Sequence, residues 1–240
     1  MHAAIDWARS TVLAGDPEEF APGSLRFLLQ ECTRVTDAAL RTAVEQGLTR
    51  ALHLVHTDPD PCRRIEWVRL LAEAAAFSDD PRLSEAAVRA LPAAVDLLES
   101  HVRHAYEPGD GLMGASCEAQ LRGAWALLVS YELTGRVPYA MLAEELFRLA
   151  TGRWWDETSA RFGDGVAATC AGLRVASGLA ALHADSEYRA AAIMAPGADP
   201  ALQARRMAGA IAAHAEAFPR DAGDVGQGLA VWFALESDLQ

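Results

Sequence analysis

The chain contains no lysine, although 21 of its 240 residues are arginine. This absence excludes mechanisms built on a lysine, which include Schiff-base chemistry, the P-loop and the protein-kinase site. Acidic residues outnumber basic ones by 33 to 21, giving a formal net charge of -12, and no basic stripe interrupts the sequence. Because nucleic-acid binding needs such a stripe, we expect no nucleic-acid partner.

Cysteine is also scarce, with four residues in the whole chain. That number is too small for a disulfide scaffold, and the cytoplasmic location that we expect would keep the thiols reduced. Cys62, Cys117 and Cys170 each precede or open an expected helix, but neither a Cys-x-x-Cys motif nor a Cys-His pair accompanies them. We therefore predict no metal site and no cofactor, and interpret these cysteines as small buried apolar residues.

Long apolar runs are missing as well. The longest uncharged apolar stretches, such as residues 124–131 and 175–184, fall short of the roughly 20 residues of a membrane span. Residues 1–14 include Asp6 and Arg9 and lack the continuous apolar centre of a signal peptide. The sequence accordingly predicts a cytoplasmic protein with no membrane partner.

What is abundant is alanine, with 50 residues, and a helical repeat of apolar positions. Alanine is the best helix former, and the apolar residues recur with a period of 3.6 rather than alternating as in a strand. These patterns predict an all-α fold. A mass of 25.7 kDa allows one sizeable core, and no linker divides the chain, so we expect a single domain over residues 1–240.

The boundaries of the expected helices follow from local chemistry. Asp80 before Pro81 is typical of a helix start, and Gly135 of a helix end. Pro92 is expected to kink or split its helix. The predicted helices cover residues 2–14, 24–34, 36–56, 63–78, 82–105, 116–134, 138–153, 166–184, 186–194, 200–218 and 225–237.

The chain also contains an internal repeat of helical hairpins. Residues 67–98, 125–149 and 173–194 each hold an apolar helix, a short turn and a more charged helix, and residues 28–54 form a fainter copy. Longer loops rich in glycine, aspartate and aromatic residues separate the hairpins at 106–114, 154–165 and 218–224. Stacking such hairpins places short turns at one end and long loops at the other, where functional residues concentrate.

Three of these segments carry a resemblance to known families: the turn 133–139, the loop 155–163 and the turn 185–190. The sequence resembles the α/α toroid of six-hairpin glycosidases, N-acylglucosamine 2-epimerases and the helical part of thioredoxin-linked toroid proteins. The resemblance implies a compact α/α toroid, incomplete if judged by the roughly twelve helices usual in these families. It also implies carbohydrate metabolism and, for an enzyme, a carbohydrate-active hydrolase or isomerase.

Within a toroid, carboxylates near the long-loop end would supply acid and base catalysis. Glycoside hydrolysis uses two carboxyl groups roughly 5–10 Å apart, one with a raised pKa. We predict Asp110, Glu118 and Asp164 as the catalytic acids, because a first-turn acid such as Glu118 would point at the central cavity. Arginine can clamp an anionic group and an aromatic face can hold a sugar ring. The predicted substrate-binding residues are Arg64, Trp67, Arg122, Trp155 and Asp156.

Each of these assignments has a structural alternative. Asp156 and Asp164 are also suited to capping turns and helix starts. Arg64, Arg122 and Arg174 could clamp a carboxylate or phosphate, but ion pairs with Glu66, Glu118 and similar neighbours are the interpretation that we favour.

Two functions remain open at this point. One is binding or processing of a small molecule, a sugar or sugar derivative, by carboxylate acid/base chemistry. The other is a non-catalytic helical-repeat scaffold, in which the alanine-rich faces of 166–184 and 204–215 dock a protein partner or a second copy in a homodimer.

Overall fold

The computed structural model describes residues 2–16, 20–78, 80–105, 115–163, 165–191 and 199–238. These residues form eleven α-helices and one two-stranded antiparallel ladder, which confirms the all-α prediction. In chain order the helices are α1 (His2–Leu13), α2 (Pro22–Cys32), α3 (Ala38–Thr57), α4 (Pro61–Phe77), α5 (Pro81–Ala105), α6 (Cys117–Thr134), α7 (Val137–Trp154), α8 (Val166–Ala184), α9 (Ser186–Ala191), α10 (Pro200–Ala212) and α11 (Ala222–Asp238).

Capping side chains define most of the helix starts. The Asp80 carboxylate accepts a hydrogen bond of 3.0 Å from the Arg82 amide at the start of α5, as expected. Asp37 and Asp60 do the same at the starts of α3 and α4. Gly135 ends α6 with a φ of 69°, the left-handed conformation that the sequence predicted there.

The structure differs from three local expectations. Helix α5 runs from Pro81 to Ala105 without a break, so Pro92 does not split it. The helix expected over 200–218 ends at Ala212, and Pro219 disfavours a helical conformation only at Phe218. Two 3-10 turns, η3 (Ala215–Ala217) and η4 (Pro219–Asp221), lead from there into α11. The sequence also gave no sign of the ladder, in which β1 (Trp155–Asp156) pairs with β2 (Arg161–Phe162).

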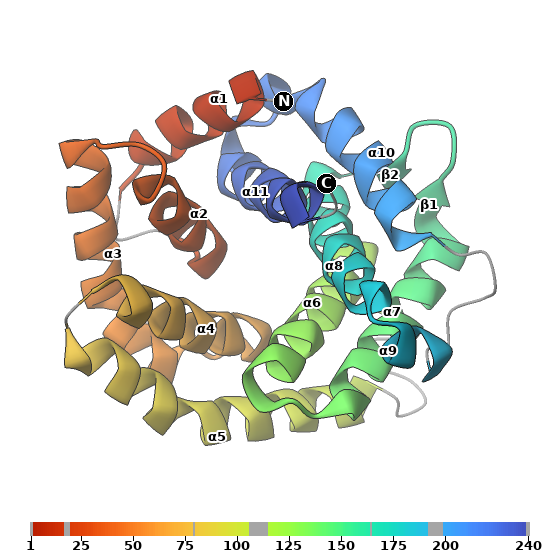
Figure 1. Ribbon diagram of the computed structural model, residues 1–240, viewed down its shortest axis with the longest axis horizontal. Helices are drawn as coiled ribbons and strands as arrows, with labels where there is room; N and C mark the ends of the chain where they lie inside the picture. The colour runs from red at the N-terminus through yellow and green to blue at the C-terminus, as the bar shows by residue number, and fades with distance from the viewer. Residues whose placement is uncertain are drawn as a thin grey trace.

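Five of the helices make a closed cycle of contacts. Helix α2 contacts α4, α4 contacts α6, α6 contacts α8, α8 contacts α11, and α11 contacts α2. Figure 1 shows these inner helices around the centre of the molecule. The cycle closes within one chain, since α2 and α11 come from opposite ends of the sequence.

The remaining long helices, α1, α3, α5, α7 and α10, lie outside the inner helices (Figure 1). We call them the outer helices. Outer helix α5 packs on α4, α7 on α6 and α10 on α8. The N-terminal helix α1 packs on the C-terminal inner helix α11, so the two chain ends complete a pair. The apolar core lies between inner and outer helices and includes Trp67, Phe147 and Trp232.

Helix α8 is enclosed by its neighbours, and twelve of its 19 residues are buried. It is also the one helix in the described part of the chain that is long and apolar enough to cross a membrane by length and composition, and 61% of that stretch is buried inside the protein. It packs against α6, α10 and α11. The alanine-rich faces of α8 and α10, which the sequence suggested for docking a partner, thus pack against each other.

The contact that closes the cycle depends on a small residue. A Cβ atom added at Gly226 of α11 would lie 2.5 to 2.8 Å from three ring carbons of Phe27 on α2. Real Cβ atoms do not approach carbon so closely, and both Phe27 and the surrounding core are fully buried.

Gly226→Ala is therefore expected to destabilise the protein by about 1–3 kcal/mol, because overpacking forces α2 and α11 apart. The matched control is Gly209→Ala on α10, where an added Cβ meets nothing within 4 Å. That change should stabilise by about 0.5–1 kcal/mol through helix propensity alone. Urea unfolding measures both, and equal effects at the two sites would contradict the closed cycle.

Candidate functional site

A pocket of about 180 Å³ opens where the inner helices begin. Its walls come from the first two turns of α2, α4, α6 and α11 and the first half of α8, so all five inner helices contribute. Helix N-termini carry unpaired amide groups and partial positive charge. The lining residues are Ala21, Pro22, Gly23, Arg63, Glu66, Glu118, Arg122, Ala167, Arg174 and Asp224.

The pocket has a buried floor and a more exposed rim. Glu66 and Arg174 form the floor, since their side chains are only 8% and 5% exposed. Arg63, Arg122 and Asp224 stand at the rim with 42%, 32% and 43% of their side chains exposed. The pocket therefore places one carboxylate and one guanidinium in a poorly hydrated position, within reach of a small ligand.

Glu66 is the most perturbed acid of the site. Burial raises the pKa of its carboxyl group, and Asp224 adds to this, while Arg174 and Arg122 act in the opposite direction. Its Oε2 lies 3.9 Å from Arg174 Nη1, and it forms no hydrogen bond with any residue that the structure describes. A buried carboxyl group with a raised pKa and an open face is suited to proton transfer.

Arg174 connects the inner helices around the pocket floor. Its Nη1 donates a hydrogen bond to Gln227 Oε1 on α11, and its Nη2 lies 3.4 Å from Asp224 Oδ1. Its guanidinium also lies 5.9 Å from the ring centre of Trp125 on α6. Gly23 of α2 leaves room for this arrangement, because a Cβ atom there would collide with the Gln227 amide. Arg174 is thus held in one orientation by three neighbouring helices.

Two aspartates before α4 orient the arginines of the rim. Asp58 is buried and accepts a hydrogen bond of 3.0 Å from Arg63, and Asp60 accepts one of 3.1 Å from Arg122. Burial acts to raise the pKa of Asp58, but hydrogen bonds from the Asp60 amide, the Trp67 indole and Arg63 outweigh it and lower the pKa. The ionised Asp58 therefore fixes the position of Arg63.

Of the predicted site residues, Glu118 and Arg122 line the pocket. Arg64 and Trp67 do not line it; they support the loop before α4 instead. Arg64 donates to the Asp58 carbonyl oxygen at 3.0 Å, and the buried Trp67 indole donates to the Asp58 carboxylate at 3.0 Å. The structure therefore gives both side chains a partner in the protein.

Trp155 and Asp156 lie in the β1–β2 ladder and do not line the pocket either. Trp155 packs on Phe162, with ring centres 5.1 Å apart. Asp156 caps the turn by accepting hydrogen bonds from the Thr158 amide and the Ser159 hydroxyl, which is the structural alternative that the sequence left open. Asp110 and Asp164 lie outside the described residues, so their prediction as catalytic acids stays a prediction.

Sequence reasoning missed Glu66 and Asp224 as site residues and treated Arg174 mainly as an ion-pair partner. A usable sign was present for Arg174, which is the one arginine in α8, a helix with no acidic residue and twelve buried positions. A lone charge in such a helix needs partners from neighbouring elements. Glu66 carried no comparable sign, because α4 holds several charged residues.

The cysteines do not converge on a metal site within the described residues, where no group of three or more His, Cys, Asp or Glu is arranged to hold a metal ion. Burial raises the pKa of Cys62 to about 12 and that of Cys117 to about 11, so both thiols stay protonated at neutral pH. Burial likewise raises the pKa of Cys170.

In comparisons with known proteins, the chain matches no protein-family model, no curated protein and no solved structure.

The raised pKa of Glu66 makes a prediction about stability. A carboxyl group that is harder to ionise in the folded than in the unfolded state favours folding below its unfolded pKa, and this contribution is lost as the pH rises through the folded pKa. Glu66→Gln should therefore be more stable than the wild type at pH 8, and this advantage should disappear as the pH falls to 4. Asp224 and Gln227 still hold Arg174 in the variant.

Thermal unfolding at a series of pH values measures this difference. Glu118→Gln at the exposed rim is the matched control, and it should change stability by less than about 0.5 kcal/mol at every pH. A Glu66→Gln variant that is destabilised most at pH 8 would contradict the account, since it would mean that the ionised carboxylate stabilises the fold.

Proposed function

We propose that this chain is a five-hairpin α/α toroid that binds and processes a small polar molecule, a sugar or sugar derivative, at the N-terminal end of its inner helices. The closed cycle of inner helices supports the toroid assignment. So does the pairing of α1 with α11, because it supplies the fifth outer helix. The single observation that carries the function is the pocket itself, in which a buried carboxyl group with a raised pKa shares the floor with a buried arginine.

The size and polarity of the pocket favour a small hydrophilic ligand. A pocket of about 180 Å³ is smaller than the roughly 300–1,000 Å³ typical of sites for drug-sized ligands, so it suits one sugar ring better. Six of its ten lining residues are charged, and they present both hydrogen-bond donors and acceptors. Hydroxyl groups, which both donate and accept, match such a surface.

In the proposed reaction, Glu66 transfers the proton. Burial raises the pKa of Glu66 and so favours its protonated form, which can act as general acid and then, once ionised, as general base. Arg174 stands 3.9 Å away and stabilises the carboxylate after the proton has left. Glu118 and Asp224 at the rim are the second carboxylates from which a base or a stabilising charge would come.

The alternative, a non-catalytic scaffold for a protein partner, has less support. The alanine-rich faces proposed for docking pack against each other in α8 and α10. The large apolar side chains that are exposed in the described residues come from four different helices, α4, α5, α7 and α10. They are Phe77, Val88, Val137, Met141 and Leu202. A docking surface would gather such residues in one patch.

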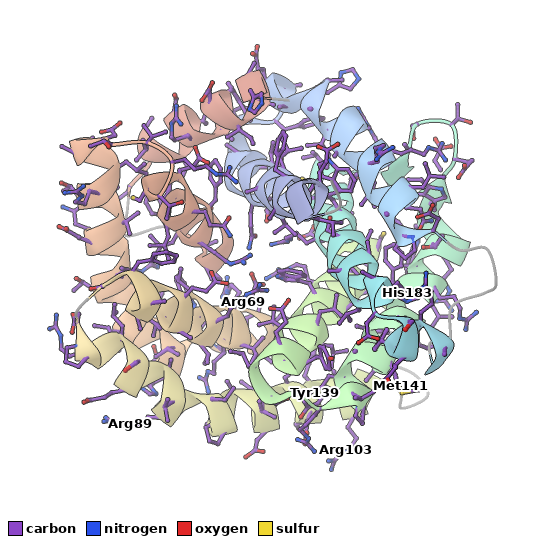
Figure 2. All side chains as sticks on the ribbon, in the orientation of Figure 1. Arg69, Arg89, Arg103, Tyr139, Met141 and His183 are labelled. Carbon is purple, nitrogen blue, oxygen red and sulfur yellow. The ribbon has the colours of Figure 1, made fainter. Side chains whose placement is uncertain are left out.

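A thermal-shift screen tests the binding step, with neutral sugars, amino sugars, uronic acids and sugar phosphates as the probes. A ligand present at one hundred times its dissociation constant should stabilise the protein by about 2.7 kcal/mol. Arg122→Gln at the rim should reduce the shift. Arg89→Gln on α5, which Figure 2 shows outside the inner helices, is the matched control and should leave it unchanged. Equal responses of the two variants would place the ligand elsewhere.

The catalytic step is tested with the ligand that gives the largest shift, whose conversion is followed by proton NMR. Glu66→Gln should slow conversion by about 10²-fold or more while the ligand still stabilises the variant, because only proton transfer is lost. Unchanged conversion by Glu66→Gln would overturn the role of Glu66. A flat screen with every probe would favour the scaffold.

A further inference from the structure

A second polar layer lies beneath the pocket. Each inner helix follows its pocket-lining residue, after three positions, with another polar or indole-bearing side chain. Three residues of α-helix correspond to one turn on the same face and a rise of about 4.5 Å. This second layer therefore lies one helical turn deeper than the pocket floor, inside the cycle of inner helices, which we call the ring. It consists of Arg26, Arg69, Trp125, Ser177 and Gln227, which follow Gly23, Glu66, Arg122, Arg174 and Asp224.

Figure 2 shows the side chain of Arg69 between the inner helices, toward the centre of the ring, whereas Arg89 and Arg103 lie on the outside of α5. Only 15% of the Arg69 side chain is exposed, and Arg26 and Trp125 are buried. The ring thus keeps cationic side chains in its interior, where burial of an unpaired charge is costly.

The second layer contains hydrogen-bonding atoms that the protein leaves unused. Nine buried side-chain nitrogen or oxygen atoms have no hydrogen-bond partner among the described residues, and four of them belong to this layer. These four are Arg26 Nη1, Arg69 Nη1, Trp125 Nε1 and Ser177 Oγ, and Arg174 Nε in the pocket floor directly above is a fifth. Buried polar atoms without a protein partner usually form hydrogen bonds with a water molecule, an ion or a ligand.

Ion pairs hold both arginines of the layer in place without using all their nitrogens. Glu73 on α4 accepts a hydrogen bond from Arg26 Nε at 2.7 Å and another from Arg69 Nε at 2.9 Å. Glu132 on α6 lies 2.8 Å from Arg69 Nη2. Each guanidinium is therefore oriented by carboxylates, while its Nη1 stays available as a donor.

Trp125 joins this layer to the pocket. The guanidinium carbon of Arg69 lies 5.2 Å from its ring centre and that of Arg174 lies 5.9 Å from it. Arg174 also lines the pocket. Arg174 in the pocket floor and Arg69 in the second layer therefore lie beside the same indole.

The five buried atoms without a partner favour a ligand of negative charge. Four of the five are N–H donors that cannot accept a hydrogen bond, and the serine hydroxyl can donate as well. A cation would find no free carboxylate among these atoms, and a water molecule must donate as well as accept. An oxyanion accepts several hydrogen bonds at once and gains from two nearby guanidinium groups.

We propose that the second layer binds an oxyanion, a carboxylate or phosphate group, between Arg69, Trp125, Ser177 and Arg174. This inference rests on the proposed function and deepens it: the substrate is an acidic sugar derivative whose anionic group enters the ring beneath Glu66. Glu66 and the rim then act on the part of the ligand that remains in the pocket.

Two conservative variants test the proposal with inorganic phosphate, acetate, glucuronate, glucose 6-phosphate and glucose as the probes. Trp125→Phe removes one unused donor and keeps an aromatic ring, and Ser177→Ala removes one hydroxyl group. The matched controls are Trp232→Phe and Ser130→Ala, which make the same changes at buried sites outside this layer. Dissociation constants at low salt are measured by calorimetry, and thermal unfolding shows that each variant is folded.

We expect the anionic probes to bind more tightly than glucose, and both test variants to weaken anion binding by roughly tenfold or more. The controls should bind as the wild type does. Comparison of phosphate with acetate, and of glucose 6-phosphate with glucuronate, shows which oxyanion the layer prefers.

Glucose binding that no anionic group improves would overturn this inference and leave the proposed function standing. Anion binding that is the same in all four variants would overturn it too, since the anion would then lie on surface arginines. Binding of inorganic phosphate that depends on Trp125 and Ser177, with no sugar bound, would support the oxyanion site and contradict the sugar-based function.

Discussion

The structure depends on one constraint: charged side chains face the middle of the ring and must be neutralised there. Arg26, Arg69 and Arg174 lie inside the cycle of inner helices, where water is limited. An unpaired buried charge costs several kcal/mol, so each arginine needs a carboxylate or amide from a neighbouring helix. The pairs Arg26–Glu73 and Arg69–Glu132 join α2 to α4 and α4 to α6. The Arg174–Gln227 hydrogen bond joins α8 to α11.

This constraint also explains the outer helices. With polar side chains turned inward, each inner helix must bury its apolar residues on the opposite side. Buried leucines of α4 and α6 accordingly belong to the apolar core, and these two helices pack on α5 and α7. Burial of apolar surface supplies the stability from outside the ring, and the interior remains polar. A polar interior in a stable ring is the property on which the proposed site depends.

The order of the chain places the site at one end. Each inner helix runs from the pocket end to the far end, and an outer helix returns the chain, so the five N-termini meet. The loop 154–165 precedes α8 and residues 218–224 lead into α11, so the pocket lies at an end where long loops occur. The sequence indicated this placement because short turns and long loops alternate along it.

Most of the fold could be predicted, because helix boundaries depend on local chemistry. Asp80 and Gly135 act as caps as predicted. The site was harder, because it depends on which face of a helix turns inward. On α4 the residues predicted for the site, Arg64 and Trp67, are each one position from the residues that line the pocket, Arg63 and Glu66. One position turns a side chain by about 100° around the helix. When both faces of a helix carry charged residues, periodicity alone does not show which of two neighbouring residues faces the pocket.

The most direct test of the account is the titration of Glu66 itself. Carbon-13 NMR of the side-chain carboxyl group, assigned by comparison with Glu66→Gln, follows ionisation of this residue in the folded, ligand-free protein. The account predicts a midpoint above the ordinary value of 4.5, because burial raises the pKa of Glu66 more than Arg174 and Arg122 lower it. A midpoint at or below 4.5 would show a carboxylate stabilised by its arginines, and it would contradict a role for Glu66 in proton transfer.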